Sequence, residues 1–143
     1  MPKPDPALLD PARYPFQCEI ETRYRDLDSN LHVNNGVMAS LLEEGRVRFH
    51  RASTIGHTVE DMTSMVVSLG VEFLGQSHFP EPLEMHVGIS HVGRTSYRLD
   101  QLVTQQGRVV TYAQAVLVCV REDSPAQLPQ VYRDAAAAWM LRP

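Results

Sequence analysis

Asp28, Asn30 and His32 stand at alternate positions in one short segment, and an apolar helical pattern follows almost at once. In an extended segment alternate side chains share one face, so we expect this carboxylate, amide and imidazole to lie together. A helix beginning here adds unpaired backbone N–H groups and the positive end of its dipole, both of which suit a developing oxyanion. Such groups can hydrolyse an activated acyl group without a serine or cysteine nucleophile.

Asp28 is the expected oxygen base or nucleophile. It either activates a water or attacks the acyl carbonyl directly, and the sequence does not separate the two. The backbone N–H of Asn34 or Asn35 is the expected oxyanion donor, which would contribute ~3 kcal/mol to lowering the barrier. The alternative role for Asp28 is that of a turn residue whose carboxylate accepts local N–H groups.

The same segment resembles a known family. Asp-Leu-Asp-Ser-Asn-Leu-His-Val-Asn-Asn at residues 26–35, then Leu-Leu-Glu-Glu-Gly-Arg at 41–46, resembles the signature of hotdog-fold acyl thioesterases of the 4-hydroxybenzoyl-CoA thioesterase-like group. Its Asp-x-Asn-x-His-Val-Asn-Asn form is especially similar to the acyl-ACP thioesterases. The resemblance implies a catalytic carboxylate at Asp28, with Asn30 and His32 orienting the carboxylate, the water or the thioester.

The sequence departs from this family pattern at Leu31, where many relatives of the 4-hydroxybenzoyl-CoA type carry glycine. Some relatives also carry a further catalytic glutamate, for which Glu72 is the nearest candidate. Asp26 is expected to hold the loop. The turn Gly-Arg94-Thr95-Ser96 resembles one that lies near the CoA tail in relatives, although a plain hairpin turn explains it equally well.

Other constellations give no competing chemistry. Glu43 and Glu44 are adjacent on the expected helix and do not face each other, so at least one is expected to be solvated. The histidines lack the spacing of a metal site, and the serines lack a Gly-x-Ser-x-Gly elbow. We therefore expect no metal and no cofactor.

Composition narrows the class of protein. The chain has 143 residues, 43% of them hydrophobic, and a net charge of −4, which disfavours nucleic acid as a partner. It contains no run of ~18 apolar residues, so no membrane contact is expected. The N-terminus lacks the apolar core of a signal peptide, so a cytoplasmic location follows by default. Cys18 and Cys119 are expected to be buried free thiols.

The hydrophobic pattern predicts one domain over residues 1–143, with 1–15 as an irregular arm. The predicted strands are residues 16–23, 64–74, 83–92, 96–104 and 109–121. A helix is predicted over 35–50, fading before Gly56, and a short one over 130–141. This order indicates an α+β protein. It matches the hotdog fold, a five-stranded antiparallel sheet wrapped around one long central helix.

The most favoured function is hydrolysis of an acyl-CoA. One alternative is an acyl-ACP thioesterase, against which the net charge of −4 argues weakly because ACP is acidic. Another is a non-catalytic hotdog protein that only binds acyl-CoA. The resemblance implies a homodimer paired edge to edge, or a homotetramer. One helix cannot cover both faces of a five-stranded sheet, and edge strands need partners, which supports association.

Overall fold

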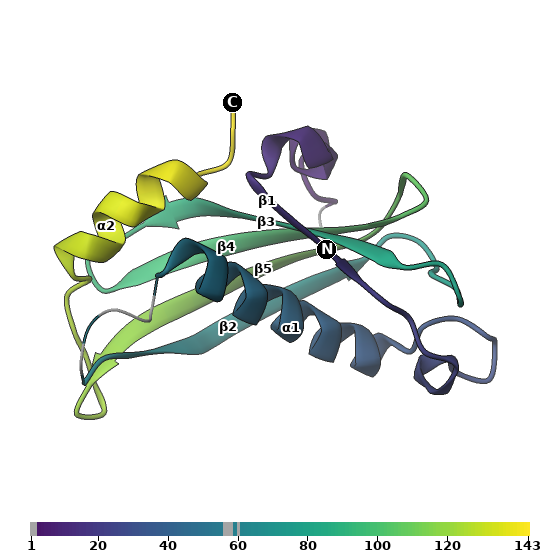
Figure 1. Cartoon of the computed structure of the whole chain (residues 1–143), viewed down its shortest axis with the longest axis horizontal. Helices are drawn as coiled ribbons and strands as arrows, with labels where there is room; N and C mark the ends of the chain where they lie inside the picture. Colours follow the sequence, from purple (N-terminus) through teal and green to yellow (C-terminus); the bar gives the residue numbers. More distant parts are fainter. Residues whose placement is uncertain (1–2, 56–58, 60) are drawn as a thin grey trace.

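The computed structural model describes residues 3–55, 59 and 61–143 as a curled sheet that holds one long helix (Figure 1). Its strands are β1 (Phe16–Ile20), β2 (Thr63–Phe73), β3 (Leu83–Val92), β4 (Ser96–Gln105), β5 (Arg108–Arg121) and the two-residue β6 (Ser124–Pro125). The helices are α1 (Asn35–Ser53) and α2 (Gln130–Ala136). Short 3-10 helices span Pro6–Leu9, Pro11–Arg13, Tyr24–Asp26 and Ala137–Trp139.

The strands lie in the order β1, β3, β4, β5, β2, with β6 paired to β5, and all pairs are antiparallel. The expected α+β hotdog architecture is thus confirmed, with β6 as a small addition. The β4–β5 hairpin turns at Gln106 and Gly107, whose φ angles are 51° and 76°. A two-residue turn with positive φ at both positions matches the strand twist, and glycine adopts this backbone region without strain.

Some strands and helices end at residues other than those predicted. The first strand ends at Ile20 rather than at residue 23, because Thr22 Oγ1 donates to the Glu81 carbonyl (3.1 Å) and the chain then enters a 3-10 turn. Helix α1 ends at Ser53, followed by Thr54 with φ 61°. The expected end before Gly56 is confirmed, whereas Gly56 and His57 lie outside the described residues. The C-terminal helix is shorter than predicted.

Helix α1 packs its buried side chains, including Met38, Leu42 and Phe49, on one face of the sheet. Gly45 permits the closest approach, because a Cβ there would lie 2.6 Å from Met85 Cγ and 3.1 Å from Gln101 Nε2. The helix therefore lies close to β3 and β4 at this glycine.

The edge strand β2 is not covered in this way. Val66, Leu69 and Phe73 are 41%, 40% and 47% exposed. They pair with Leu117, Ala115 and Thr111, residues of β5 that are themselves buried. Because paired residues share a face, these apolar side chains belong to the face on which α1 lies. One helix is too narrow to cover them.

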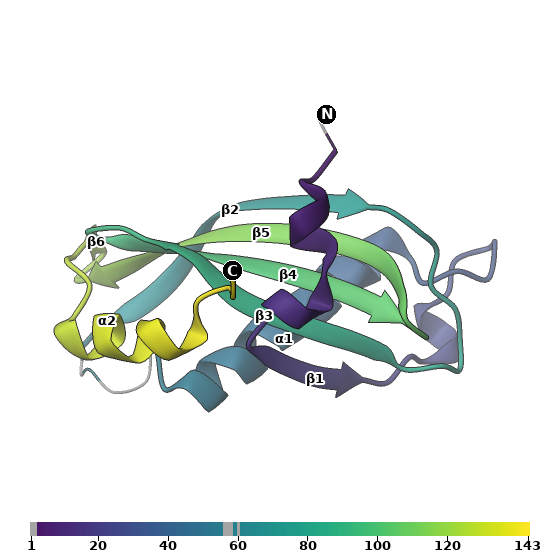
Figure 2. The same ribbon diagram turned by 90° about the horizontal axis from the view of Figure 1, so that it is seen from above.

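The N-terminal arm crosses the opposite, outer face of the sheet (Figure 2). Tyr14 packs there with Leu102 and Tyr112, and its hydroxyl donates to the Leu8 carbonyl (2.7 Å). The arm meets the C-terminal segment, where Arg142 N donates to the Arg13 carbonyl (2.7 Å) and Arg13 Nε to the Arg142 carbonyl (2.7 Å). The arm is therefore a cover for the outer face.

Two sequence expectations concern smaller features. Cys18 and Cys119 are free thiols, with Cys119 buried as expected and Cys18 only half-buried. Among the described residues, we find no helix with the length and apolar character required to cross a bilayer.

Candidate active site

The segment carrying Asp28 is a tight turn. Asp28 N donates to the His32 carbonyl (2.8 Å), Leu31 N donates to the Asp28 carbonyl (3.0 Å), and Leu31 has φ 63°. The expectation of an extended segment with alternate side chains on one face is wrong. Asp28, Asn30 and His32 nevertheless line one cavity of about 200 Å³, because the turn curls them around it.

Leu31 occupies the left-handed position of this turn. That backbone region disfavours a side chain with a Cβ and favours glycine. The glycine of relatives is therefore explained by backbone conformation. The Leu31 side chain is 60% exposed and is not among the residues lining the cavity.

Asp28 fixes the turn through one of its carboxylate oxygens. Oδ1 accepts the backbone N–H groups of Asn30 (2.9 Å) and His32 (3.2 Å), which is the local bonding considered as its alternative role. Oδ2 makes no hydrogen bond to any residue that the structure describes. The carboxylate is thus oriented by one oxygen and presents the other.

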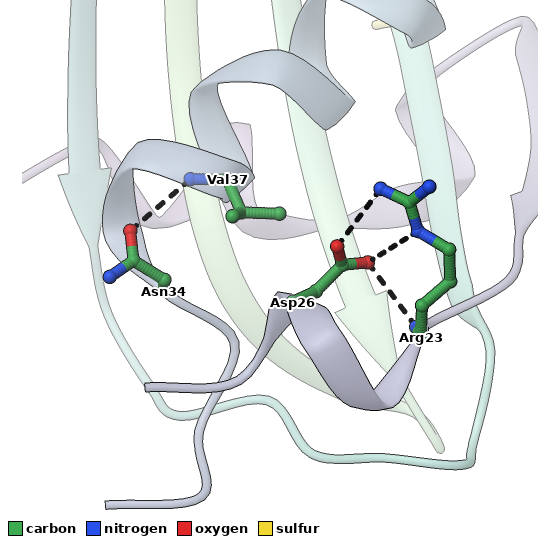
Figure 3. A network of polar contacts seen from close by, with 4 residues as sticks. All are labelled: Arg23, Asp26, Asn34 and Val37. Atoms are coloured by element: carbon green, nitrogen blue, oxygen red, sulfur yellow. Dashed lines mark hydrogen bonds and ion pairs between the residues drawn. The ribbon is translucent and has the colours of Figure 1, made fainter. Parts of the chain in front are cut away.

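Asp26 anchors the loop to the start of α1, and Figure 3 draws its carboxylate bound to Arg23. Its buried carboxylate accepts Arg23 NH2 (3.0 Å), Arg23 Nε (3.2 Å) and Arg23 N (3.2 Å), and its carbonyl accepts the N–H of Asn34 (2.9 Å). The loop-holding role expected for Asp26 agrees with these contacts. The ion pair with Arg23 fixes the direction of the Asp26 carboxylate and so the position of the loop.

The start of α1 provides one available N–H group. Asn34 is the N-cap, and its Oδ1 accepts Gly36 N (2.7 Å) and Val37 N (3.4 Å), the second of which is drawn in Figure 3. Since the N–H of Asn34 already donates to Asp26, its expected role as an oxyanion donor does not fit. The N–H of Asn35 makes no hydrogen bond within the described part of the chain, and Asn35 lines the cavity. Asn35 remains the fitting donor.

The opposite wall comes from the segment after β2, which the sequence analysis did not assign to the site. Gly75, Gln76 and Ser77 line the cavity, and the Ser77 carbonyl accepts the N–H of Val33 (2.9 Å). The other lining side chains come from the start of α1 and from β2 and β5: Val33, Met38, Phe73 and Thr111. The break at residues 75–82 marked a loop, but nothing in it indicated contact with the motif.

His78, the residue after Ser77, contacts the motif through its ring. Its ring stands edge-on to that of His32, with centroids 5.1 Å apart. The buried amide of Gln105 fixes its backbone, with Oε1 accepting His78 N (2.8 Å) and Nε2 donating to the carbonyls of His78 (2.8 Å) and Glu81 (2.7 Å). Gln105 therefore orients the loop that faces the motif.

Two other candidates lie elsewhere. Glu72 precedes Phe73, which lines the cavity, and adjacent strand residues point to opposite faces, so Glu72 does not fit as a second catalytic carboxylate. Arg94, Thr95 and Ser96 form the β3–β4 turn, where Gly93 N donates to the Ser96 carbonyl (2.7 Å). Ser96 pairs with Val118, which pairs with Met65 near the start of β2.

The structure therefore does not bring this turn to Asp28 within one chain. Phe73 marks the far end of β2, and the eight residue steps from Met65 to Phe73 separate the turn from the cavity by about 26 Å at ~3.3 Å per residue.

Comparisons with known proteins identify the class. Residues 22–139 match the family model of the thioesterase-like superfamily, and the chain belongs to that superfamily. It is accordingly an enzyme of the thioester hydrolase class with the hotdog fold. A search of curated proteins finds no match.

Several solved structures share the fold. A thioesterase from Thermus thermophilus, solved with coenzyme A and Zn, is 28% identical, with a TM-score of 0.79 over 92% of this chain and 98% of that one. A predicted thioesterase from Bacillus stearothermophilus is 22% identical, with a TM-score of 0.80 over 90% and 98%. A 1,4-dihydroxy-2-naphthoyl-CoA thioesterase from Synechocystis is 19% identical, with a TM-score of 0.75 over 85% and 95%.

Proposed function

We propose that this protein is an acyl-CoA thioesterase whose reaction takes place in the Asp28 cavity. The observation that carries the proposal is that Asp28, Asn30, His32 and Asn35 line the same cavity at the start of α1. The Thermus thermophilus relative was solved with coenzyme A, which supports CoA as the carrier.

Each group has a defined chemical role. Asp28 Oδ2 accepts a proton from water as the water oxygen bonds to the thioester carbonyl carbon, and the Asn35 N–H stabilises the resulting oxyanion. The C–S bond then breaks, the electron pair leaves on sulfur, and the thiolate takes the proton held by Asp28, so the products are a carboxylic acid and a thiol. Direct attack by Asp28 gives a mixed anhydride instead, which water hydrolyses to the same products.

Asn30 and His32 orient the reacting groups. His32 is positioned by its backbone N–H bond to Asp28 Oδ1 and by its contact with the His78 ring. Its imidazole can donate to, or accept from, a water near Asp28. The bonds from Asn30 and His32 to Asp28 Oδ1 hold the carboxylate in one orientation, as the reaction requires.

We also propose that two copies pair along β2. Among the described residues no strand pairs with the outer edge of β2, and apolar side chains are exposed there on the face where α1 lies, so antiparallel pairing about a two-fold axis would satisfy the edge and cover part of that apolar surface. The pairing would place the residue 94–96 turn of one copy at the Asp28 end of the other. Arg94 would then be available to bind a phosphate of CoA.

The first experiment is a thiol-release assay on short, long and aryl acyl-CoAs with the wild type and Asp28→Asn. Asparagine retains an oxygen that can accept the N–H groups of Asn30 and His32, so the turn survives while the basic oxygen is lost. We expect kcat to fall by about a thousandfold, within the range of a lost general base or nucleophile. Asp134→Asn, at an exposed position, is the matched control.

Unchanged turnover in Asp28→Asn would refute the mechanism. Activity on acyl-ACP alone would select the alternative carrier. Binding of acyl-CoA without turnover on either carrier would select the non-catalytic alternative.

A further inference from the structure

A second cavity, of about 350 Å³, lies between α1 and the first half of β2. Its walls combine apolar and polar side chains, namely Glu43, Arg46, Val47, His50, Ile55, Ser64, Val66 and Leu117. None of these residues lines the Asp28 cavity. The mechanism proposed above therefore leaves this cavity without a role.

The unusual member of the lining is Arg46, which is only 6% exposed. Its NH1 donates to Gln101 Oε1 (2.9 Å), and no carboxylate in the described part of the chain lies within ion-pair distance. A guanidinium carries five N–H donors, and the structure gives the other donors of Arg46 no partner among the described residues. They are free to bind an anion that enters the cavity.

The surroundings hold Arg46 toward the cavity. Gln101 is fully buried, and its Nε2 donates to the Leu42 carbonyl (2.9 Å), which leaves Oε1 to receive Arg46. Burial lowers the pKa of Arg46, and the negative charge of Glu43 acts in the opposite direction. Glu43 is exposed and forms no ion pair with Arg46, so it compensates the charge from a distance.

The rest of the lining matches a small amphipathic molecule. Val47, Val66 and Leu117 provide an apolar wall. A polar chain runs beside it, from His50 Nε2 to the Tyr97 hydroxyl (2.8 Å) and on to Ser64 Oγ (3.2 Å). A single anionic group near Arg46, attached to an apolar body, would satisfy both parts.

We propose that this cavity binds an organic acid, with its carboxylate paired to Arg46 and its apolar part against Val47, Val66 and Leu117. The carboxylate accepts two parallel N–H bonds from the guanidinium, the geometry that planar arginine favours. The proposal rests on the proposed function only for the source of the acid. That source is either a free carboxylic acid, the product class of thioester hydrolysis, or the far end of a dicarboxylic acyl group still joined to its carrier.

The second source depends on the proposed pairing. Antiparallel β2 strands would set the Ser64 end of one copy beside the Phe73 end of the other, where the Asp28 cavity lies. An acyl group bound for hydrolysis in one copy would then point its far end at the Arg46 cavity of the other.

The first arm of the test measures binding of hexanoate, adipate and neutral hexanamide to the intact protein by calorimetry. We expect both carboxylates to bind, and hexanamide to bind at least tenfold more weakly. Arg46→Met keeps the apolar stem and should weaken carboxylate binding at least tenfold, whereas Arg46→Lys, which keeps the charge, should retain part of it. Glu43→Gln should leave the affinity unchanged or raise it, because a repelling charge is removed.

The second arm compares adipyl-CoA with hexanoyl-CoA in the thiol-release assay. If the occupant is carrier-linked, Arg46→Met raises KM for adipyl-CoA and leaves KM for hexanoyl-CoA unchanged. If it is a free acid, carboxylate binding depends on Arg46 while both KM values stay the same.

Failure of either proposal can be recognised separately. Absence of carboxylate binding by the wild type, or equal binding by wild type and Arg46→Met, would overturn the carboxylate site whatever the enzyme hydrolyses. Arg46-dependent carboxylate binding by a protein that hydrolyses no thioester would support the site and refute the proposed function.

Discussion

Helix α1 packs closely on some strands of the sheet and loosely on others. Over β3 and β4 it approaches so closely that Gly45 has no room for a Cβ, and Arg48 NH1 reaches the Glu19 carbonyl on β1 (2.9 Å). Over β2 it leaves apolar side chains exposed and a cavity beside Arg46. We call β1, β3 and β4 the packed half and β2 the open edge.

The difference separates stability from function. The packed half buries the apolar side chains of β3 and β4 against α1. The open edge borders both cavities, since Phe73 lines the first, and Ser64 and Val66 line the second. The β1 edge spans five residues and the β2 edge eleven, and a long edge with exposed apolar side chains is the one that favours pairing.

A charge introduced on the open edge should have the largest effect on association. Leu69→Arg should weaken self-association at least a hundredfold, about 3 kcal/mol, because pairing would bury an unpartnered cation. Light scattering should then give the 16.1 kDa mass of one chain, against twice that for the wild type. Unfolding free energy should stay within about 0.5 kcal/mol of wild type at concentrations where both are monomeric, because position 69 is exposed in one chain. Gln17→Arg, an exposed position on β1, is the control and should keep the wild-type mass.

An overpacking substitution tests the packed half. Gly45→Ala should lower the free energy of unfolding by about 1–2 kcal/mol, since the strain of an extra methyl exceeds the gain of ~1 kcal/mol in helix propensity. Urea denaturation measures it, with Ser40→Ala at an exposed position of α1 as the control. A more stable Gly45→Ala protein would show that Met85 yields without strain.

The outer face of the packed half predicts a pH dependence. His86 is buried, its Nε2 lies 3.1 Å from Thr104 Oγ1, and burial lowers its pKa below the ordinary 6.5. The folded protein thus favours the neutral ring, and below pH 6.5 the unfolded chain binds more protons. The contribution of His86 to stability should be fully present above pH 6.5 and be lost as the pH falls toward its lowered pKa.

Replacing the ring identifies its contribution. Urea denaturation between pH 8 and 5 should show a shallower loss of stability in His86→Gln than in the wild type. His91→Gln, at an exposed position of the same strand, is the control. Parallel curves for wild type and His86→Gln would assign the pH dependence to other groups.

The smallest effect concerns the surface of α1. Glu44 and Arg48 form an exposed ion pair four residues apart (2.9 Å), which should contribute about 0.3–0.5 kcal/mol. Arg48→Ala should cost more than Glu44→Ala, because it also removes the bond to Glu19. A double-mutant cycle by urea denaturation separates the two; equal single-mutant losses would mean that the contact with β1 adds no stability.

The sequence predicted the elements better than their contacts. The strand Leu83–Val92 has the predicted ends, because Pro82 and Gly93 flank a segment in which apolar residues mostly alternate with polar residues or glycine. The grouping of Asp28, Asn30 and His32 was predicted from an extended backbone, whereas a turn at Leu31 produces it. Alternation and turn formation leave similar spacings over five residues, so the two are not separable by pattern.

Long-range contacts were beyond the pattern. The clamp of Gln105 on His78 joins positions 27 apart, and no local signal marks either residue. Arg46 occupied a helical position typical of a surface charge, and its burial depends on the concave shape of the whole sheet. Asn34 shows a different limit: the path of the loop, which the pattern does not predict, directs the N–H of Asn34 to the Asp26 carbonyl.

The contact between Arg13 and Arg142 has a consequence for folding kinetics. It spans 129 positions, so forming it early would close nearly the entire chain into one loop, at a high cost in entropy. Local hairpins such as β4–β5 avoid that cost and are expected to form first. The arm should therefore dock after the folding transition state, so that weakening it would accelerate unfolding and leave the folding rate nearly unchanged.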